Sequence, residues 1–292
     1  MSVEETTVAS NYFVGMCCEG GARFVAVDAM EPALEMKRRH KLMGNASVLA
    51  AESLVMAALL SAHVKGDERL TLQVFAEDPQ FNFSADVNGD GSVRGRFFPQ
   101  RMVPGKSFRG TITVLKSLWQ QELYRSLADV QDETIEQALS RYLRTSQQTD
   151  ARVYVLAERD LKNNLVFAAG LLVERLPHMD AEDFAARMDV EGAVDLKALM
   201  MGLEGQIGGD ARIGGDLEIM GAQTLHYACS CSAERVRGIL RAMGHEEVRL
   251  LIEEQGKAEV NCHFCNTDYV VEKPELEQIL AELAAERPAG EA

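Results

Sequence analysis

Two short stretches near the C-terminus decide how the chain is interpreted: Tyr-Ala-Cys-Ser-Cys-Ser-Ala-Glu-Arg at 227–235 and Ala-Glu-Val-Asn-Cys-His-Phe-Cys-Asn at 258–266. They hold Cys229 and Cys231 in one close pair and Cys262 and Cys265 in another. Zinc prefers four soft ligands in a tetrahedron, and two chelating pairs brought together by folding supply a closed thiolate site. The pattern therefore predicts one zinc ion per chain, bound by these four cysteines in the reduced form.

Other interpretations of this region are weaker. Buried, inert cysteines would not be expected in a polar turn such as 261–268. His226, His245 and His263 are alternative ligands, but four thiolates already complete the shell. The segment between the pairs predicts helices at 234–243 and 246–254, and a last helix is predicted at 274–287.

Length and charge bound the rest of the chain. It has 292 residues and a formal net charge of -15, with 47% hydrophobic residues, which predicts two compact units and a buried core. An acidic surface repels phosphate groups, so neither nucleic acid nor an anionic membrane is an expected partner. The first eight residues do not resemble a secretory signal, and the apolar stretch 48–64 is short for a membrane span, so we expect a cytoplasmic protein.

Residues 1–176 predict an α+β core in which helices pack on a β-sheet. The alternation of apolar and polar residues from Leu70 to Val74 and from Phe81 to Val87 is typical of strands, and the turn at 88–91 predicts a hairpin. Asn45 is the expected N-cap of an apolar helix that ends near Gly66. The predicted strands are 12–14, 23–27, 70–74, 81–87, 93–97, 108–115, 153–157 and 165–172, and the predicted helices are 30–41, 45–66 and 134–144.

The segment 177–224 differs in character because it combines acidic residues, five methionines and two Gly-Gly pairs. Short helices are predicted at 181–188 and 194–203. They carry an apolar stripe, which we expect to cover the sheet face formed by Leu70, Leu72 and Val74. The residues of the stripe are Met188, Leu196, Leu199, Met200, Met201 and Leu203.

Cys17 and Cys18 stand apart from the other cysteines. Adjacent strand residues point to opposite faces, so one half-buried and one exposed thiol without metal are expected, and a reactive thiol is the alternative. The sequence shows no convincing pairing of a nucleophile with a base, no carboxylate dyad and no phosphate loop. We therefore expect no enzymatic activity and no nucleotide requirement.

The cysteine region closely resembles the 33 kDa chaperonin family of redox-regulated heat-shock chaperones. Further similarity runs through the helix at 46–64, the strand at 70–74, Val93-Arg94-Gly95, Ser146-Gln147 and the stretch 168–172. The resemblance implies a core at 1–176, a metastable helical linker at 177–224 and a zinc-binding redox-switch domain at 225–292.

The resemblance also implies a function: an ATP-independent holdase that binds unfolding proteins and is quiet while reduced and zinc-bound. Oxidation would pair Cys229 with Cys231 and Cys262 with Cys265, release zinc, unfold the C-terminal region and favour a homodimer. The apolar stripe of the linker would then bind clients. The alternative to client binding is that this stripe is the ordinary core-facing side of two stable helices.

Two other functions compete with the chaperone. A thiol–disulfide oxidoreductase would use Cys262-x-x-Cys265, but that motif is expected at the N-terminus of a helix beside a βαβ unit. A zinc-ribbon interaction module for nucleic acid is disfavoured by the acidic balance.

Overall fold

The structure, a computed structural model, describes residues 11–101, 105–119, 121–189, 194–205, 212–215 and 217–286. The chain divides into two compact units, Met1–Ala228 and Cys229–Ala292, and each is described by itself. The predicted α+β class is confirmed, because sheets and helices occur in both units.

The first unit contains an antiparallel five-stranded sheet in the order β10-β1-β2-β9-β8. Its two central strands, β2 and β9, are apolar on both faces: Phe24, Val25, Ala26 and Val27 follow one another and are all buried. A strand that is apolar on both faces must be covered on both sides. The strands are β1 (Tyr12–Cys17), β2 (Ala22–Asp28), β8 (Ala151–Arg159), β9 (Leu165–Arg175) and β10 (Glu218–Gln223).

A second sheet has six strands in the order β11-β5-β4-β3-β6-β7, in which β11 pairs with β5 in parallel and the other pairs are antiparallel. The predicted hairpin joins β4 to β5, and Gly91 takes a φ of 82° in its turn. The long strand β7 was not predicted. The strands are β3 (Glu68–Asp78), β4 (Gln80–Asn88), β5 (Ser92–Phe98), β6 (Ser107–Leu118), β7 (Gln121–Thr134) and β11 (His226–Tyr227).

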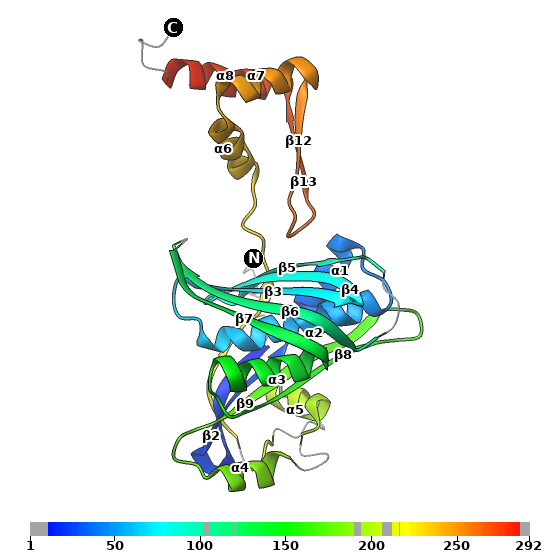
Figure 1. The fold of residues 1–292 in the computed structure, drawn as a ribbon, viewed down its shortest axis with the longest axis vertical. Coiled ribbons are helices and arrows are strands. Elements are labelled where there is room, and N and C mark those ends of the chain that lie inside the picture. The colour runs from blue at the N-terminus through cyan, green and yellow to red at the C-terminus, as the bar shows by residue number, and fades with distance from the viewer. Residues whose placement is uncertain are drawn as a thin grey trace, which may run out of the picture. The chain divides into compact units, whose positions relative to one another are not determined.

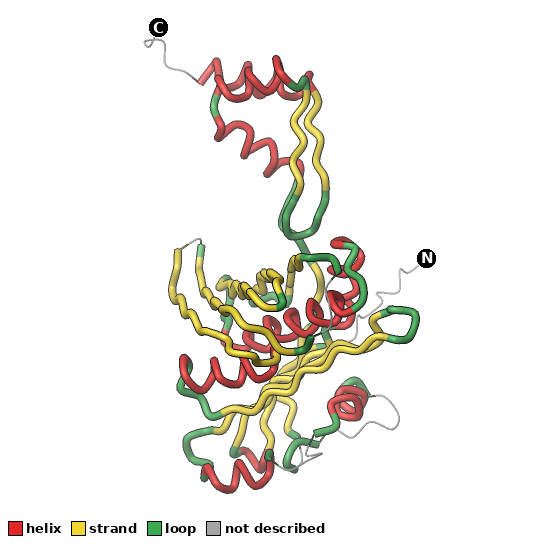
Figure 2. Tube along the Cα trace, turned by 45° about the vertical axis from the view of Figure 1, so that its right-hand side comes forward, coloured by secondary structure: helices red, strands yellow, loops and turns green. Residues whose placement is uncertain are grey.

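Three helices lie between the two sheets (Figures 1 and 2): α1 (Met30–His40), α2 (Asn45–Leu60) and α3 (Ile135–Ser146). The central helix α2 is buried almost all round because it contacts strands of both sheets. Among the described residues, the stretch Asn45–His63 has the length and apolarity of a membrane span, and 83% of its apolar window is buried inside the protein. The predicted buried core helix is thus confirmed.

The expected ends of α2 were wrong. The N-cap is Gly44, whose φ is 58°, and Asn45 is already the first helical residue. The hydroxyl of Ser47 donates to the Gly44 carbonyl at 2.7 Å. At the other end, α2 stops at Leu60 and continues as one 3-10 turn, η2 (Ser61–His63), well before Gly66.

The linker helices α4 (Ala181–Met188) and α5 (Leu196–Leu203) cover the outer face of the five-stranded sheet (Figure 1). The side chains of Asp180 and Asp195 cap them by accepting hydrogen bonds from backbone N–H groups in the first turn. The prediction that the linker covers Leu70, Leu72 and Val74 was wrong. Those residues face inward, in the cluster around α2, whereas the second apolar face of β2 and β9 is the one left for the linker.

The second unit contains α6 (Ala233–Met243), α7 (His245–Glu254), α8 (Lys273–Glu286) and the antiparallel hairpin of β12 (Lys257–Asn261) and β13 (Asp268–Glu272). It begins at Cys229 and not at residue 225, because Leu225 is buried in the first unit and β11 pairs with β5. The division into core, linker and zinc domain remains a prediction.

One buried acid in α2 makes stability depend on pH. Glu52 is 8% exposed, and burial raises its pKa to about 7, with Lys106 opposing the shift and Glu136 adding to it. A raised carboxyl pKa means that the folded state binds more protons than the unfolded state. Glu52 therefore costs stability as the pH rises from about 4.5 through about 7.

We expect Glu52→Gln to raise the free energy of unfolding by about 1–3 kcal/mol at pH 8 and to change it little at pH 4.5. Urea denaturation at the two pH values measures the effect. The exposed Glu77→Gln is the matched control and should have little effect at either pH. An equal change for Glu52→Gln at both pH values would contradict the assignment.

Candidate metal centre

Two loops of the second unit bring the four C-terminal cysteines together. Their Sγ atoms all lie within 4.8 Å of one another, with 3.7 Å between Cys229 and Cys262 and 3.2 Å between Cys231 and Cys265. A tetrahedral site with Zn–S bonds of 2.3 Å has S–S edges of about 3.8 Å. The spacing and the chemistry of the four sulfurs therefore fit a divalent, thiophilic metal ion, as the sequence pattern predicted.

The hairpin fixes the second pair. Between β12 and β13, the N–H of Cys262 donates to the carbonyl of Thr267 at 2.9 Å, and the N–H of Asn266 donates to the carbonyl of Cys262 at 2.7 Å. Asn266 takes a φ of 54°, a conformation that asparagine tolerates better than most residues. This tight turn aims both thiols at the first pair.

The first pair lies just before α6. Ser232 caps that helix by accepting a hydrogen bond from the N–H of Arg235 at 3.2 Å. Cys231 thus lies directly before a capped helix start of the same unit, which limits how far its thiol can move away from the hairpin.

The thiols of the cluster differ in acidity. Burial raises the pKa of the Cys231 thiol to about 12. The Tyr269 hydroxyl donates a hydrogen bond to the Cys231 sulfur at 3.1 Å and opposes that rise. Burial also opposes ionisation of Cys265, but its hydrogen bonds with Thr267 and Cys231 outweigh burial and lower its pKa to about 6. Ionisation of Cys265 is therefore favoured near neutral pH, whereas ionisation of Cys231 is resisted. A divalent cation would stabilise several thiolates together.

Little else holds the second unit together. Its cluster of buried apolar residues is small: Val236, Leu240, Val248, Ala258, Val271, Leu276 and Ile279. Glu282 of α8 accepts hydrogen bonds from Arg237 at 2.5 Å and from Arg241 at 3.0 Å, but partly exposed ion pairs contribute little. A core of this size needs a further stabilising element.

The three histidines considered as alternative ligands lie outside the cluster. Among the described residues, the group of ligand atoms that lie within 4.8 Å of one another consists of the four cysteines alone. His226 belongs to β11 in the first unit, His245 begins α7, and His263 is exposed in the hairpin turn.

The expectation for Cys17 and Cys18 was wrong, because both are buried, at 1% and 4% exposure. β1 ends at Cys17, and Cys18 takes a φ of 52°, which lifts it out of the strand alternation on which the expectation rested. Both thiols lie in the apolar cluster between the five-stranded sheet and the linker.

The linker stripe is mostly buried in that same cluster. Met201 alone among its six predicted residues is partly exposed, at 37%, whereas the others are at most 8% exposed: Met188, Leu196, Leu199, Met200 and Leu203. In this conformation the stripe packs as the core-facing side of two helices. Its role in binding clients remains a prediction.

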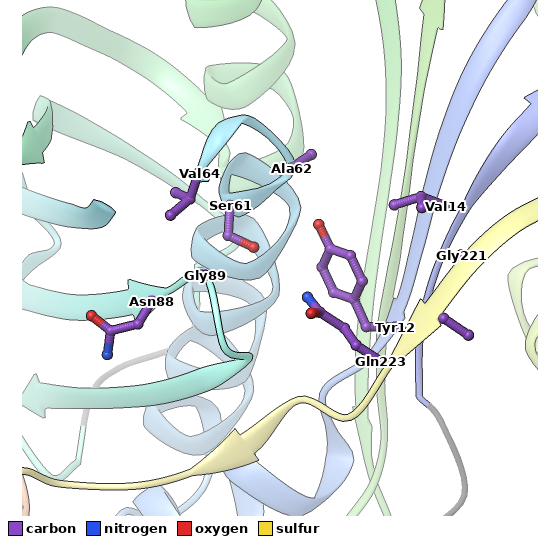
Figure 3. A pocket seen from close by; sticks show the side chains of 10 residues that line it. Tyr12, Val14, Ser61, Ala62, Val64, Asn88, Gly89, Gly221 and Gln223 are labelled. Carbon is purple, nitrogen blue, oxygen red and sulfur yellow. The ribbon is translucent and has the colours of Figure 1, made fainter. Parts of the chain in front are cut away.

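The first unit contains a cavity of about 280 Å³ that was not predicted from the sequence. Its lining comes from β1, β10, η2 with the residue that follows it, and the turn between β4 and β5. Figure 3 shows the polar side chains of Tyr12, Ser61 and Gln223 there beside small apolar ones. Burial raises the pKa of Tyr12, and a hydrogen bond with Ser61 opposes that shift. These residues are far apart in the sequence and form no motif, so pattern reasoning could not find them.

Comparison with known proteins gives a consistent result. The sequence profile described as Hsp33 protein matches residues 11–272. The 33 kDa chaperonins of Brevibacillus brevis and Bacillus licheniformis are 30% and 29% identical to this chain over 282 residues, which cover 90% and 91% of it and 96% of each relative. The crystal structure of the 33 kDa chaperonin (heat shock protein 33 homolog) of Thermotoga maritima shares the fold, with a TM-score of 0.77 at 21% identity, covering 96% of this chain and 100% of that one.

Proposed function

Because the chain belongs to the Hsp33 family of heat-shock chaperones, we propose that it is an ATP-independent holdase switched on by oxidation of its C-terminal cysteines. The observation that carries the proposal is the cluster of four Sγ atoms within 4.8 Å of one another. In the reduced chain these sulfurs would hold one zinc ion, which supplies the charge that keeps the thiolates together. Zinc-bound thiolates remain nucleophilic toward oxidants, and oxidised sulfur no longer binds the metal.

The proposed switch forms two disulfides within the sequence pairs, Cys229 with Cys231 and Cys262 with Cys265. A peroxide-class oxidant accepts two electrons from each pair and is reduced to water, and zinc leaves. Sulfur contacts of 3.7 Å and 3.2 Å join the two pairs in the reduced chain, so oxidation within each pair requires the loops to separate these contacts. Rearranged loops and a lost metal would unfold a unit whose own core is small.

Unfolding of the second unit would in turn release the linker. Its helices α4 and α5 have eight residues each, and isolated helices of that length are unstable in water. Release would uncover the linker stripe and the sheet face beneath it, which includes Phe13, Phe24 and Leu171. Such apolar surface, with its flexible methionines, suits unfolded polypeptides, and it also favours the homodimer proposed for the oxidised form.

Light scattering of an aggregating client tests the proposal. The oxidised chain should suppress aggregation near equimolar ratio, and the reduced, zinc-loaded chain should suppress it at least about tenfold less, as expected for a marginal equilibrium moved by more than about 1.4 kcal/mol. Adding ATP should change neither result. If the oxidised and the reduced chain suppressed aggregation equally, the redox switch would be refuted and the chain would be a constitutive chaperone.

The two competing functions gain no support. Cys262 and Cys265 lie in the turn of a β-hairpin and not at the N-terminus of a helix, where oxidoreductase motifs owe their low pKa to the helix dipole. The net charge of -15 still disfavours a nucleic-acid module.

A further inference from the structure

The adjacent thiols Cys17 and Cys18 lie where the core meets the linker. They end β1 and open the short turn η1 (Cys18–Gly20), in which Cys18, Glu19 and Gly20 have φ values of 52°, 57° and 83°. This turn carries the Cys18 side chain away from the sheet and toward the linker. Both thiols are distant in sequence from the metal centre and have no part in it.

A linker turn closes directly over the Cys18 sulfur. The Sγ atom lies 3.8 Å from the carbonyl oxygen of Ile213, and Gly214 follows with a φ of 61°. A Cβ on Gly214 would lie 2.9 Å from that sulfur and 3.6 Å from Sδ of Met188. A further heavy atom between Gly214 and the Cys18 sulfur would therefore force one of the two to shift.

The linker also supplies charge at this point. Arg187 of α4 donates a hydrogen bond to the Gly214 carbonyl at 3.2 Å and lies 3.5 Å from the carboxylate of Glu19. A hydrogen bond from the Cys17 thiol lowers the pKa of Cys18 to about 7 against the effect of burial, and the Arg187 guanidinium adds to the lowering. Cys17 itself is shifted the other way, because its neighbour and its burial both raise its pKa. Cys18 is thus the thiol of the pair whose pKa is lowered, and Cys17 is the neighbour whose hydrogen bond lowers it.

We propose that the Cys17-Cys18 pair is a second thiol modification site, which small disulfides reach only when the linker lifts and which then keeps the linker lifted. In the reaction, the Cys18 thiolate attacks one sulfur of the small disulfide. The S–S bond of the reagent breaks, a new S–S bond forms at Cys18, and the departing thiolate takes up the proton that Cys18 lost. The seated linker and the adduct exclude each other, so modification must shift the linker toward its open state.

This inference rests on the opening of the linker that the proposed function invokes, but not on the chemistry of the metal centre. Its test uses the full chain, reduced and loaded with zinc, and counts only the Cys18 adduct formed before a chromogenic chelator reports zinc release, so that opening by the C-terminal switch does not contribute. The probe is 4,4′-dithiodipyridine, and peptide mass spectrometry measures the adduct at Cys18 separately from every other cysteine.

The first arm loosens the linker at a distance from Cys18. Leu199→Ala removes a side chain that is 1% exposed in α5, and Met201→Ala on the same helix removes one that is 37% exposed. We expect Cys18 to react roughly tenfold faster or more in Leu199→Ala and at the wild-type rate in Met201→Ala. In the Leu199→Ala chain, the further change Cys17→Ser keeps a hydrogen-bond donor beside Cys18 and should preserve the faster reaction of Cys18. The further change Cys17→Ala removes that donor and should move the pH dependence of the Cys18 reaction to higher pH. Equal Cys18 rates in wild type and Leu199→Ala would overturn the proposal.

The second arm imitates the adduct without thiol chemistry. Cys18→Met adds bulk where the linker turn sits, and Cys18→Ser preserves the original size. Hydrogen exchange should show lost protection at 196–203 in Cys18→Met and wild-type protection in Cys18→Ser, while α2 stays protected in both. A linker as protected in Cys18→Met as in wild type would refute the steric coupling. If oxidation did not induce holdase activity, the results expected in both arms would stay the same. The proposed function and the proposed modification site can therefore be refuted independently.

Discussion

Replacing Cys265 by serine should strongly weaken zinc binding and unfold the second unit, while the two sheets of the first unit stay folded. Cys265 is 2% exposed, and its hydrogen bonds lower the pKa of its thiol to about 6 although burial raises it. A serine hydroxyl does not ionise near neutral pH and is a harder ligand, so the site would lose a quarter of its donors. We expect zinc affinity to fall by more than about 100-fold, because even losing a partner that only orients a ligand costs about 10–100-fold. Since the unit buries only a small apolar cluster, its folding depends on the free energy of zinc binding, and weaker zinc binding therefore lowers its stability.

Metal analysis of the reduced chain and hydrogen exchange of residues 229–286 measure this result. His263→Ala is the matched control, because His263 adjoins Cys262 but is exposed and lies outside the cluster. It should keep one zinc ion and wild-type protection. A Cys265→Ser chain that still binds one zinc ion with unchanged exchange would show that the four sulfurs are not the ligand set.

The cluster could be predicted from sequence because its information is local. Each pair of cysteines is separated by one or two residues, and both helices of the spacer show the apolar period expected for packing on a small core. Folding only had to bring two preformed halves together. The helix α2 could also be predicted from the sequence, because an apolar run of that length with one acidic residue is typical of a buried helix.

The errors arise where tertiary contacts override local signals. The 14-residue strand β7 is largely exposed and mixes charged with apolar residues, so its pattern was weak, and pairing with β6 determines it. The linker was assigned to the wrong sheet because the sequence does not show that α2 covers only one of the two apolar faces of β2 and β9 and leaves the other to the linker. Cys18 was misplaced because a positive φ at a non-glycine residue has no sequence signal.

Because the linker stripe packs on the five-stranded sheet, its effect on chaperone activity can be tested at single residues. If the linker stripe holds the chain inactive by covering the five-stranded sheet, weakening that contact should activate the chaperone without an oxidant. Leu199→Ala leaves a cavity at a site that is 1% exposed, and substitutions of this kind cost about 2–5 kcal/mol. The loss falls on an eight-residue helix whose intrinsic stability is low, so the linker should open before the sheets do.

We therefore expect the reduced, zinc-loaded Leu199→Ala chain to suppress client aggregation at least about tenfold better than reduced wild type, because a change of about 1.4 kcal/mol already shifts a two-state population tenfold. Met201→Ala, on the same helix with a partly exposed side chain, should behave as wild type. Hydrogen exchange must accompany the assay: protection should fall at 196–203 and persist in α2 and at 70–76. An opened linker that gives no protection to clients would show that the client surface lies elsewhere. A chain that protects clients while its linker stays closed would remove the linker from the mechanism. The buried stripe acts as an inhibitor only if opening and activity rise together, and that joint change distinguishes it from the ordinary packing face of two stable helices.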